Sequence, residues 1–511
     1  MPQTQSWPYR SAMSILRILV RAFFRRVEVE GLGNVPASRG GLLVAWHPNG
    51  LIDPALILAQ LPGRVVFGAR HGLLHTPLLG RMMKALGTVP IYRARDHGGD
   101  DASRRAANTR SLDALAAEIA AGSLSALFPE GESHDAPHMM ELKTGAARLY
   151  YRARQLQGGR DTRGGPDGDG PPPAIIPVGL HYDRKHAFRS RALVHFHPPI
   201  ALPPELDVTP PATEPDETFR ARARRLTEEI EKALELAVMP TESWEVHRLF
   251  HRARKLVRAE RAARAGANPG RPRMLEKQVG FSRIWKGYRA LRHSHPEDVE
   301  EVMDRVREYD ADLAALRLED HELDGDPRLG SSLLPIILIG QVLMVYVLLP
   351  PVLVLGIIVN LPAALLCLVL ARKFARASKD EASIKVIMAS ILFPVTWIVT
   401  ALLVTFGMVR LEAMFPGLPD APVVAGLLTA GLSAIGLGVA LSYRRLSHET
   451  MRALHVRFTR RMRAREIRRL RRERSALHDR LVSLAEGIDL PGVVTSDGCV
   501  VPSRRSEGDC A

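Results

Sequence analysis

The stretch VAWHPNGLIDPAL, residues 44–56, places a histidine and an aspartate six residues apart, between an apolar run and an Asp-Pro pair. The apolar run predicts a strand, and the Asp-Pro pair predicts a helix with Asp53 at its N-cap and Pro54 at its first position. Strand, turn and helix in this order are the unit of α/β domains. His47 then has two interpretations: an incidental residue of a surface turn, or a base whose partner is Asp53.

The same alternation of short apolar runs and helical patterns extends from about residue 30 to 205. We expect strands at residues 40–46, 64–70, 88–93, 124–131, 174–182 and 191–200. Helices are expected at residues 53–61, 75–86, 105–122 and 142–155. Residues 158–173 are rich in glycine and proline and are expected to form a flexible insertion. The 511-residue chain is long enough for more than one domain.

The last third of the chain contains long apolar stretches without any charged residue. These stretches lie between Arg328 and Arg372, between Lys385 and Arg410, and between Asp420 and Arg444. About 20 apolar residues cross a bilayer as a helix, so we expect two short spans in the first stretch and one in each of the others. Pro350 and Pro351, near the middle of the first stretch, are expected to mark a tight turn between its two spans. The sequence thus predicts about four transmembrane helices.

The N-terminal apolar stretch is interrupted by Arg17 and Arg21, which is not typical of a signal peptide. Drawn as a helix, these arginines and Arg25 share one face, opposite Leu16 and Phe23. This pattern fits a helix lying in the membrane interface, and it fits equally a helix packed on a soluble domain. The three cysteines give no disulfide framework. We therefore expect the part before the spans to be cytoplasmic.

Much of the formal charge of +15 lies near the C-terminus. Residues 457–474 contain ten arginines and two glutamates, a net charge of +8. Such a run can bind nucleic acid, but no aromatic platform or nucleic-acid motif accompanies it. Because the run closely follows the last expected span, we expect anionic membrane lipids, and no nucleic acid, as its partners.

Several ends of expected strands carry residues suited to a shared cleft: Gly87, Arg93, Glu130, Gly131, Ser133, Lys143, Gly145 and Pro177. Arg93, Lys143 and the glycine turn at Gly131 offer cations and backbone N–H groups for a phosphate. A G-x-S-x-G nucleophile motif is missing, so direct attack by a substrate hydroxyl, deprotonated by His47, is the simpler chemistry. His134 and His138 could suggest a metal site, but Pro137 interrupts the helix that it would need. No metal is expected.

The order of these motifs resembles that of the glycerolipid acyltransferases, whose blocks run histidine–aspartate, G-x-x-x-x-x-R, F-P-E-G and V-P-[VI]. In this chain the His and Asp enclose five residues instead of four, and the arginine that often follows F-P-E-G is missing. The segments HPNGLIDP, FPEGESHD and HAFRSRALVHFHPPI are similar to the fungal-type glycerol-3-phosphate and dihydroxyacetone-phosphate acyltransferases. The later REYDADLAALRLEDHEL also resembles a helical block of that branch.

This resemblance implies that His47 is the base that deprotonates the acceptor hydroxyl and that Asp53 orients it. Substrate binding is implied for Gly87, Arg93, Pro129, Glu130, Gly131, Ser133, Lys143, Gly145 and Pro177, and more weakly for Arg189 and Arg191. Acyl-CoA or acyl-carrier protein would supply the acyl group as co-substrate, and no cofactor is implied. The acceptor would be glycerol 3-phosphate or dihydroxyacetone phosphate. Acylation of lysophosphatidate, and a non-catalytic role in binding lipid, are the alternatives.

The predicted fold is an α/β acyltransferase domain followed by a charged helical region and a C-terminal bundle of about four transmembrane helices. The expected parts are an interfacial helix (1–28), the acyltransferase domain (29–210), a helical region (211–328), the transmembrane region (329–445), and a basic helical tail with a disordered C-terminus (446–511). The alanine- and arginine-rich composition suggests a bacterial cytoplasmic membrane, with the catalytic domain and the tail on the cytoplasmic side.

Overall fold

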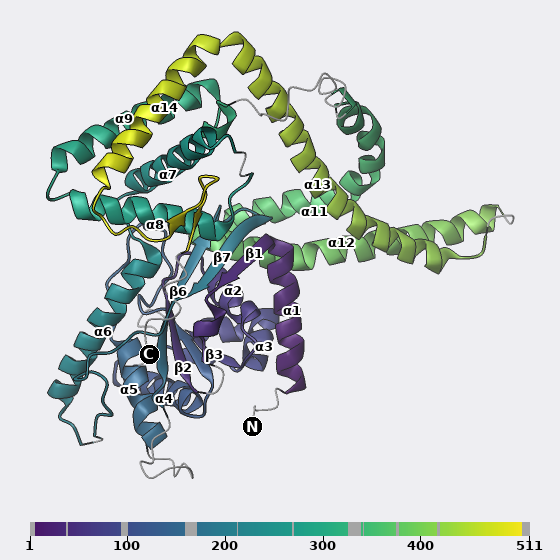
Figure 1. Cartoon of the computed structure of the whole chain (residues 1–511). Coiled ribbons are helices and arrows are strands. Elements are labelled where there is room, and N and C mark those ends of the chain that lie inside the picture. Colours follow the sequence, from purple (N-terminus) through teal and green to yellow (C-terminus); the bar gives the residue numbers. More distant parts are fainter. Residues whose placement is uncertain are drawn as a thin grey trace. The chain divides into compact units, whose positions relative to one another are not determined.

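The chain forms two compact units in the computed structural model, shown in Figure 1. The first unit comprises Met1–Trp244 with Arg376–Ser383, and the second comprises Glu245–Ala375 with Ile384–Ala511. The structure describes residues 6–36, 39–92, 101–158, 171–211, 213–267, 270–324, 339–340, 342–374, 378–415 and 419–502.

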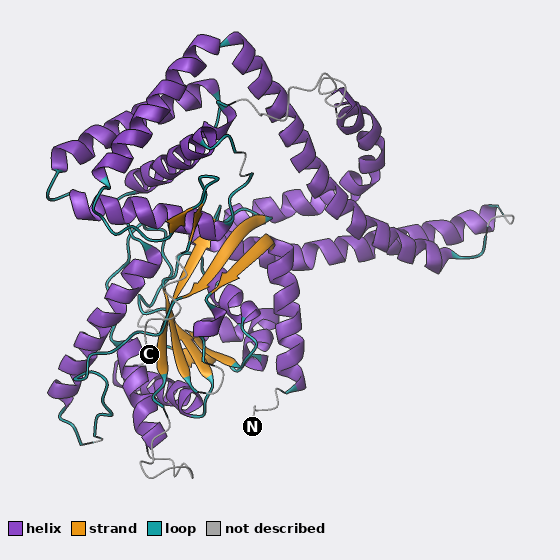
Figure 2. Ribbon diagram, in the orientation of Figure 1, coloured by secondary structure: helices purple, strands orange, loops and turns teal. Residues whose placement is uncertain are grey.

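The first unit is built on a seven-stranded sheet with the order β1-β7-β6-β2-β5-β3-β4 (Figure 2). Neighbouring strands are parallel except for β6 and β7, which are antiparallel. The strands are β1 (Phe24–Glu30), β2 (Gly41–Ala45), β3 (Val65–Arg70), β4 (Val89–Ile91), β5 (Leu124–Leu127), β6 (Ala174–Tyr182) and β7 (Ser190–Phe196). The six predicted strands are confirmed. The carboxyl ends of parallel strands meet at one edge of the sheet, where ligands bind in open α/β sheets.

Helices cover both faces of this sheet. Figure 1 shows α2 and α3 on one side of it, and α4, α5 and α6 on the other. Their bounds are α2 (Ile52–Gln60), α3 (Pro77–Ala85), α4 (Asp101–Ala120), α5 (Gly145–Gly158) and α6 (Asp216–Val238). All five residues of β2 are buried, as expected for a central strand with both faces covered. Leu42 and Val44 of β2 share one hydrophobic core with Leu115, Tyr150 and Ile230 of the helices.

The N-terminal segment differs from the predicted interfacial helix of residues 1–28. Helix α1 (Trp7–Phe23) ends at Phe23, and the next seven residues form β1, which pairs with β7 at the edge of the sheet. The sequence reasoning missed β1, although Val27 and Val29 alternate with polar residues in the way that strands do.

The predicted faces of this N-terminal helix also need correction. Leu16 and Phe23, expected to face the membrane, are buried in the first unit. Arg17, expected to face lipid headgroups, donates hydrogen bonds to the carbonyl oxygens of Ala59 and Leu61 at 3.3 Å. The helix therefore packs on the domain through most of the face that the arginine spacing had assigned to lipid.

The boundary after the α/β domain lies later than predicted. Helix α6 was expected in the helical region of residues 211–328, but its apolar stripe, including Leu226, Ile230 and Leu234, is fully buried in the core of the first unit. The first unit extends to Trp244 for this reason.

The second unit contains a helical domain assembled from distant segments of the chain. Its helices are α7 (Trp244–Arg264), α8 (Met274–Leu291), α9 (Pro296–Leu316) and α14 (Ala464–Leu484). One hydrophobic core joins α7, α9 and α14, and it includes Leu256, Val306, Tyr309, Leu470 and Leu477. Helices that precede the apolar stretches and a helix that follows them thus fold together.

The arginine-rich segment is consequently part of a folded domain rather than a basic tail. Arg474 is 2% exposed and forms two hydrogen bonds with the carboxylate of Asp324, at 2.8 and 2.9 Å. Its Nε donates to Glu260 at 2.9 Å. The C-terminal segment also forms a short hairpin, β8 (Val493–Val494) and β9 (Val500–Val501). Part of the predicted disorder, residues 503–511, lies outside the described residues.

Three described helices are long and apolar enough to cross a membrane: Gly356–Phe374, Ile384–Met414 and Pro422–Met462. They belong to α11 (Leu349–Phe374), α12 (Ser378–Met414) and α13 (Pro422–Met462). The last of these continues past its apolar part as one helix to Met462.

The predicted turn at Pro350 and Pro351 is wrong. Helix α11 begins at Leu349, and helical structure continues on the N-terminal side of both prolines, so the chain does not turn back at this point. A π-helical segment, η5 (Met344–Leu348), directly precedes it. The described part of the first apolar stretch therefore holds one candidate span instead of two. Residues 325–338, where the first of the two spans was expected to begin, lie outside the described residues.

Small and polar residues mediate the packing between α11 and α13. An added Cβ on Gly356 or Gly436 would come within 3 Å of the other glycine's backbone, at 2.9 and 2.8 Å from its Cα. One turn further, Asn360 is 3% exposed and donates to the carbonyl of Ser433 at 2.9 Å. Trp397 of α12 donates to Asn360 at 2.9 Å. Close backbone approach at small residues, with side-chain hydrogen bonds between helices, is typical of membrane bundles.

Gly436→Ala should destabilise this bundle, because the new Cβ would lie 2.8 Å from the Cα of Gly356. Overpacking of this kind costs about 1–3 kcal/mol, so the thermal unfolding midpoint of the detergent-solubilised protein should fall. Gly431→Ala is the matched control on the same helix, where an added Cβ meets nothing within 4 Å. Equal midpoints for the two variants would contradict the close approach of α11 and α13.

Candidate active site

The candidate site lies at the edge of the sheet where β2, β5 and β6 end. His47 follows β2, Glu130 follows β5, and Tyr182 is the last residue of β6. Because β2 pairs with both β5 and β6 in parallel, these three ends are brought together by the sheet itself. The sequence predicted the first two of these residues for the site and missed the third.

His47 and Asp53 form a hydrogen bond of 2.8 Å between Nδ1 and Oδ2. The turn between them is closed by the backbone N–H of Asn49, which donates to the same carboxylate oxygen at 2.7 Å. Asp53 was expected at the N-cap of its helix, but α2 begins at Ile52 and its N-cap residue is Leu51. The Asp53 carboxylate is fully buried and points back to the turn and the imidazole.

Tyr182 holds the second oxygen of the Asp53 carboxylate. Its hydroxyl donates to Oδ1 at 2.5 Å. Burial, and then the negative charge of Asp53, raise the pKa of Tyr182 well above its usual value. The phenol therefore stays protonated and remains a donor. In the sequence, Tyr182 belongs to no motif. The only indication that it could reach the site was its position at the end of an expected strand.

The second ring nitrogen of His47, Nε2, is the one that can act on a substrate. Since Asp53 accepts from Nδ1, the proton of the neutral ring is held there and Nε2 carries the lone pair. Phe128 stacks on the ring with a centroid distance of 4.0 Å and an interplanar angle of 11°. The side chain of His47 is 16% exposed. No described residue hydrogen-bonds Nε2, so this atom can accept a proton from a substrate.

Glu130 of the F-P-E-G motif positions His47 instead of binding a phosphate. Its Oε2 accepts the backbone N–H of His47 at 3.0 Å, and its Oε1 accepts from His134 at 2.7 Å and from the N–H of Met140 at 2.9 Å. The side chain is 2% exposed. A buried carboxylate occupied by protein donors cannot favour a second anion, so the predicted contact between Glu130 and the acceptor phosphate is corrected.

His134 supports this arrangement and shows no sign of metal ligation. Its Nδ1 accepts the N–H of Ala136 at 3.2 Å, which leaves Nε2 as the protonated nitrogen that donates to Glu130. Among the described residues, no group of three or more His, Cys, Asp or Glu side chains could hold a metal ion.

The glycine turn after Glu130 lies beside a lysine. Gly131 has φ 77°, a left-handed conformation that favours glycine. An added Cβ there would lie 2.7 Å from Nζ of Lys143, so the ammonium group lies directly over the turn. The backbone N–H of Lys143 donates to the carbonyl of Pro129 at 2.9 Å, which fixes the segment before α5 beside the motif. Lys143 is exposed and, within the described ranges, has no carboxylate partner.

The other predicted substrate-binding residues have varied positions. Gly87, with φ 73°, ends the helix α3 in the left-handed conformation typical of helix ends. Gly145 is the first residue of α5, and Ser133 lies in the turn between Glu130 and Lys143. Pro177 is buried within β6, where its carbonyl accepts the N–H of His197 at 2.9 Å. Arg93 lies outside the described residues.

Arg189 and Arg191 are engaged at the start of β7. Arg189 donates to the carbonyl of Arg21 at 3.3 Å, and Arg191 donates to Asp183 at 2.7 Å. The loop between β6 and β7 also carries Lys185, which the sequence did not single out. Its ammonium donates to the carbonyl of Pro48 at 3.2 Å and pairs with Asp135, so it links the His47 turn to the segment after F-P-E-G.

Two protein families match this chain. Residues 26–181 match the Acyltransferase family, and residues 271–489 match the Glycerol-3-phosphate acyltransferase 2 C-terminal domain. The first match contains His47, Asp53 and Glu130 and ends one residue before Tyr182, and the second contains most of the helical domain and the three apolar helices.

Curated relatives come from two yeasts. An uncharacterized acyltransferase of Schizosaccharomyces pombe is 25% identical over 403 residues, which cover 62% of this chain and 55% of the relative. Glycerol-3-phosphate O-acyltransferase 1 of Saccharomyces cerevisiae is 26% identical over 195 residues, covering 38% of this chain and 23% of the relative. Glycerol-3-phosphate O-acyltransferase 2 of the same yeast is 28% identical over 95 residues, 19% and 11% of the two chains. The chain thus spans about half of the first relative and less of the others.

A solved structure, the 1-acyl-sn-glycerophosphate (LPA) acyltransferase of Thermotoga maritima, is 16% identical and covers 44% of this chain and 82% of its own, with a TM-score of 0.28. The three curated relatives are fungal, and the bacterial origin stays a prediction. The two family matches and the yeast relatives confirm the predicted resemblance to the fungal-type glycerol-3-phosphate acyltransferases.

Proposed function

We propose that the protein transfers a fatty acyl group from a thioester donor to a hydroxyl of glycerol 3-phosphate, the first acylation of phospholipid synthesis. The observation that carries this proposal is the pair of His47 and Asp53, 2.8 Å apart at the sheet edge within the acyltransferase domain. The match of the C-terminal domain and the yeast relatives favour glycerol 3-phosphate as acceptor. Dihydroxyacetone phosphate is the neighbouring acceptor, since it presents a hydroxyl and a phosphate in the same relation.

In the proposed mechanism, Nε2 of His47 accepts the proton of the acceptor hydroxyl while the hydroxyl oxygen attacks the thioester carbonyl. The tetrahedral intermediate collapses with loss of the thiolate, which takes up the proton. Asp53 keeps the imidazole in the required tautomer and stabilises its transient positive charge. Tyr182 and the N–H of Asn49 keep the carboxylate in place. The reaction as written needs no metal or cofactor.

Lys143 is the cation that we assign to the acceptor phosphate. It is exposed beside the F-P-E-G turn, and that turn is tied to His47 through Glu130. Arg93 stays a second candidate for binding the acceptor phosphate, because it follows β4 at the position of the arginine in the G-x-x-x-x-x-R motif. Arg189 and Arg191 are weaker candidates, because their guanidinium groups already have partners.

Two alternatives differ in acceptor or in class. Acylation of lysophosphatidate would use the same base and the same phosphate site. A non-catalytic lipid-binding protein would not require a buried carboxylate that fixes the tautomer of a histidine whose side chain is only partly accessible, so the geometry favours catalysis. The two possible acyl donors, acyl-CoA and acyl-carrier protein, are both thioesters and differ only in the molecule that carries the thiol.

We further propose that the helical domain and the α/β domain share the cytoplasmic side of the membrane. Helices α7 and α9 precede the apolar stretches and α14 follows them, yet their side chains form one core. The chain between them must therefore cross the membrane an even number of times. Helices α12 and α13 supply two crossings, and the stretch around α11 either enters and returns or crosses twice. The turn after α12 is then on the outer side.

Contact with anionic headgroups stays a proposal for the arginines nearest the apolar part of α13. Arg444 follows that part directly, and Arg445 after it already pairs with Glu449 at 2.8 Å, whereas Arg457 lies about 20 Å further along the same helix at 1.5 Å per residue. Several arginines of the run, Arg469, Arg471 and Arg474, are engaged with acidic residues of the helical domain.

His47→Ala should lower kcat for acyl transfer by about 10²–10⁴-fold, the usual contribution of a general base. His138→Ala is the matched control, because His138 is exposed and lies in the segment after the same motif. Activity is measured as release of thiol from the acyl donor, with the amount of folded protein checked by size-exclusion chromatography. Activity of His47→Ala within twofold of the wild type would exclude His47 as the base.

Lys143→Ala should raise KM for glycerol 3-phosphate more than KM for the acyl donor, since a charge-assisted phosphate contact is lost. Lys84→Ala, an exposed lysine on α3, serves as the control. The same assay with glycerol 3-phosphate, dihydroxyacetone phosphate and lysophosphatidate ranks the acceptors by kcat/KM. Equal changes in KM for acceptor and donor would argue against a phosphate contact, and a preference for lysophosphatidate would replace the proposed acceptor.

Topology can be tested in a variant whose three cysteines, Cys367, Cys499 and Cys510, are replaced by serine. A new cysteine at Asp420, after α12, should react with an impermeant thiol reagent in intact cells, whereas one at Arg472 on α14 should react only after permeabilisation. Labelling at Arg472 from outside would place α14 on the outer side and would overturn the proposed cytoplasmic position of the helical domain.

A further inference from the structure

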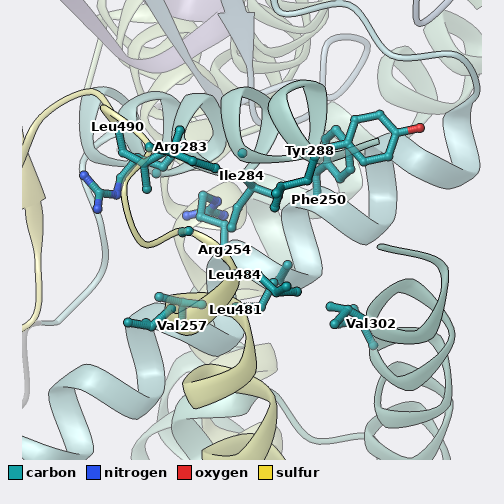
Figure 3. A pocket seen from close by; sticks show the side chains of 18 of the residues that line it. Phe250, Arg254, Val257, Arg283, Ile284, Tyr288, Val302, Leu481, Leu484 and Leu490 are labelled. Atoms are coloured by element: carbon teal, nitrogen blue, oxygen red, sulfur yellow. The ribbon is translucent and has the colours of Figure 1, made fainter. Parts of the chain in front are cut away.

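A cavity of about 490 Å³ lies within the helical domain, enclosed by α7, α8, α9 and α14 (Figure 3). Its volume falls within the range of about 300–1,000 Å³ that is usual for ligand sites. Most of its wall is apolar, with Phe250, Val257, Ile284, Val302, Leu481 and Leu484 among the lining residues. Every lining residue belongs to the second unit, and none belongs to the predicted active site.

One end of this cavity carries positive charge. Arg261 and Arg283 both line it, and Figure 3 shows the guanidinium of Arg283 at the end near Leu490, with Tyr288 at the opposite end. Arg283 donates to the carbonyls of Pro491 and Gly492, each at 3.0 Å. Neither arginine has a carboxylate partner among the residues that the structure describes.

Three acidic residues line the cavity, and none forms an ion pair with Arg261 or Arg283; Glu486 has no ion pair among the described residues, and the other two are paired elsewhere. Glu276 is occupied by Arg258 at 2.5 Å, and Asp489 pairs with Lys286 at 3.2 Å. Burial, and then the charge of Arg283, lower the pKa of Arg261 to about 10. Burial also lowers the pKa of Arg283. Both directions mean that the two cations lack a compensating anion, which a bound ligand would supply.

We propose that this cavity binds one long acyl chain whose anionic head group is held by Arg261 and Arg283. An apolar wall that ends at two cations without carboxylate partners matches an amphiphile better than it matches a neutral hydrocarbon or a small polar anion. The carboxylate of a free fatty acid and the phosphate of a lysophosphatidate share this chemistry. Val482, which lines the cavity and is 39% exposed, marks where a chain enters. The site is separate from the residues proposed for catalysis and would bind lipid whether or not they act.

The proposal can be tested by photolabelling the full-length protein, purified in a short-chain detergent, with a palmitate analogue that carries a diazirine on its chain. Labelled peptides should come from α7, α8 and α14. Ile284→Trp fills the cavity and should reduce this labelling at least tenfold, whereas Ala290→Trp, an exposed position on the same helix, should not. Labelling confined to the apolar helices α11–α13, or equal labelling of both variants, would overturn the proposal.

Arg261→Gln should weaken palmitate binding by about 10–100-fold, the usual worth of hydrogen bonds to charged groups. Arg248→Gln, an exposed arginine on the same helix, is the matched control and should leave binding unchanged. Competition by unlabelled lipids shows which head group the arginines bind. Competition by palmitate but not by lysophosphatidate would identify a carboxylate, and the reverse would identify a phosphate. Competition by hexadecanol as strong as that by palmitate would overturn the role of the arginines.

Chain length gives a test on the unmodified protein, so the proposal does not depend on the folding of any variant. Each buried methylene contributes about 0.8 kcal/mol, so shortening the competing fatty acid by two carbons should weaken it on the order of tenfold. A series from sixteen to ten carbons with constant affinity would show that the chain is not buried and would overturn the proposal.

Discussion

The candidate active site depends on one buried carboxylate. Asp53 is fully buried, and its two oxygens accept hydrogen bonds from the imidazole of His47, the backbone of Asn49 and the phenol of Tyr182. Such a charge is tolerable in the interior only when donors replace the lost hydration. The three donors come from the turn after β2 and from the end of β6, so the sheet must form before the carboxylate is satisfied. The tautomer of His47, the turn after β2 and the register of β2 against β6 are therefore determined together.

A second buried carboxylate, that of Glu130, follows the neighbouring strand β5 and is likewise surrounded by protein donors. It holds the backbone of His47 and the ring of His134, so the F-P-E-G turn cannot move independently of the histidine. Both anions face inward, whereas the exposed group beside the turn is the ammonium of Lys143. The site thus keeps its negative charge buried and presents positive charge to solvent, as an anionic substrate requires.

The sequence predicted the parallel part of the sheet, the apolar helices and the His47–Asp53 pair, because short apolar runs, uncharged stretches and motif order are local signals. It missed β1, a seven-residue edge strand directly after a helix, where the charged side chains hide the alternation. The role of Glu130 was misassigned because a motif gives residue types and not the direction of a side chain. Tyr182 could not be found, since its contact spans 129 positions in the chain. The fold of the arginine run also depends on distant partners, Asp324 and Glu260 for Arg474.

The shared core of α7, α9 and α14 has a consequence for synthesis of the chain. Helix α9 ends at Leu316 and α14 begins at Ala464, so the apolar faces of α7 and α9 leave the ribosome long before their partner exists. Tyr309 and Leu313, buried in the finished domain, cannot reach their final packing during that interval. The core of the helical domain therefore closes only after the apolar helices have been synthesised, and α14 is the segment that completes it. Until then, apolar side chains of α7 and α9 lack the partner that covers them in the folded chain.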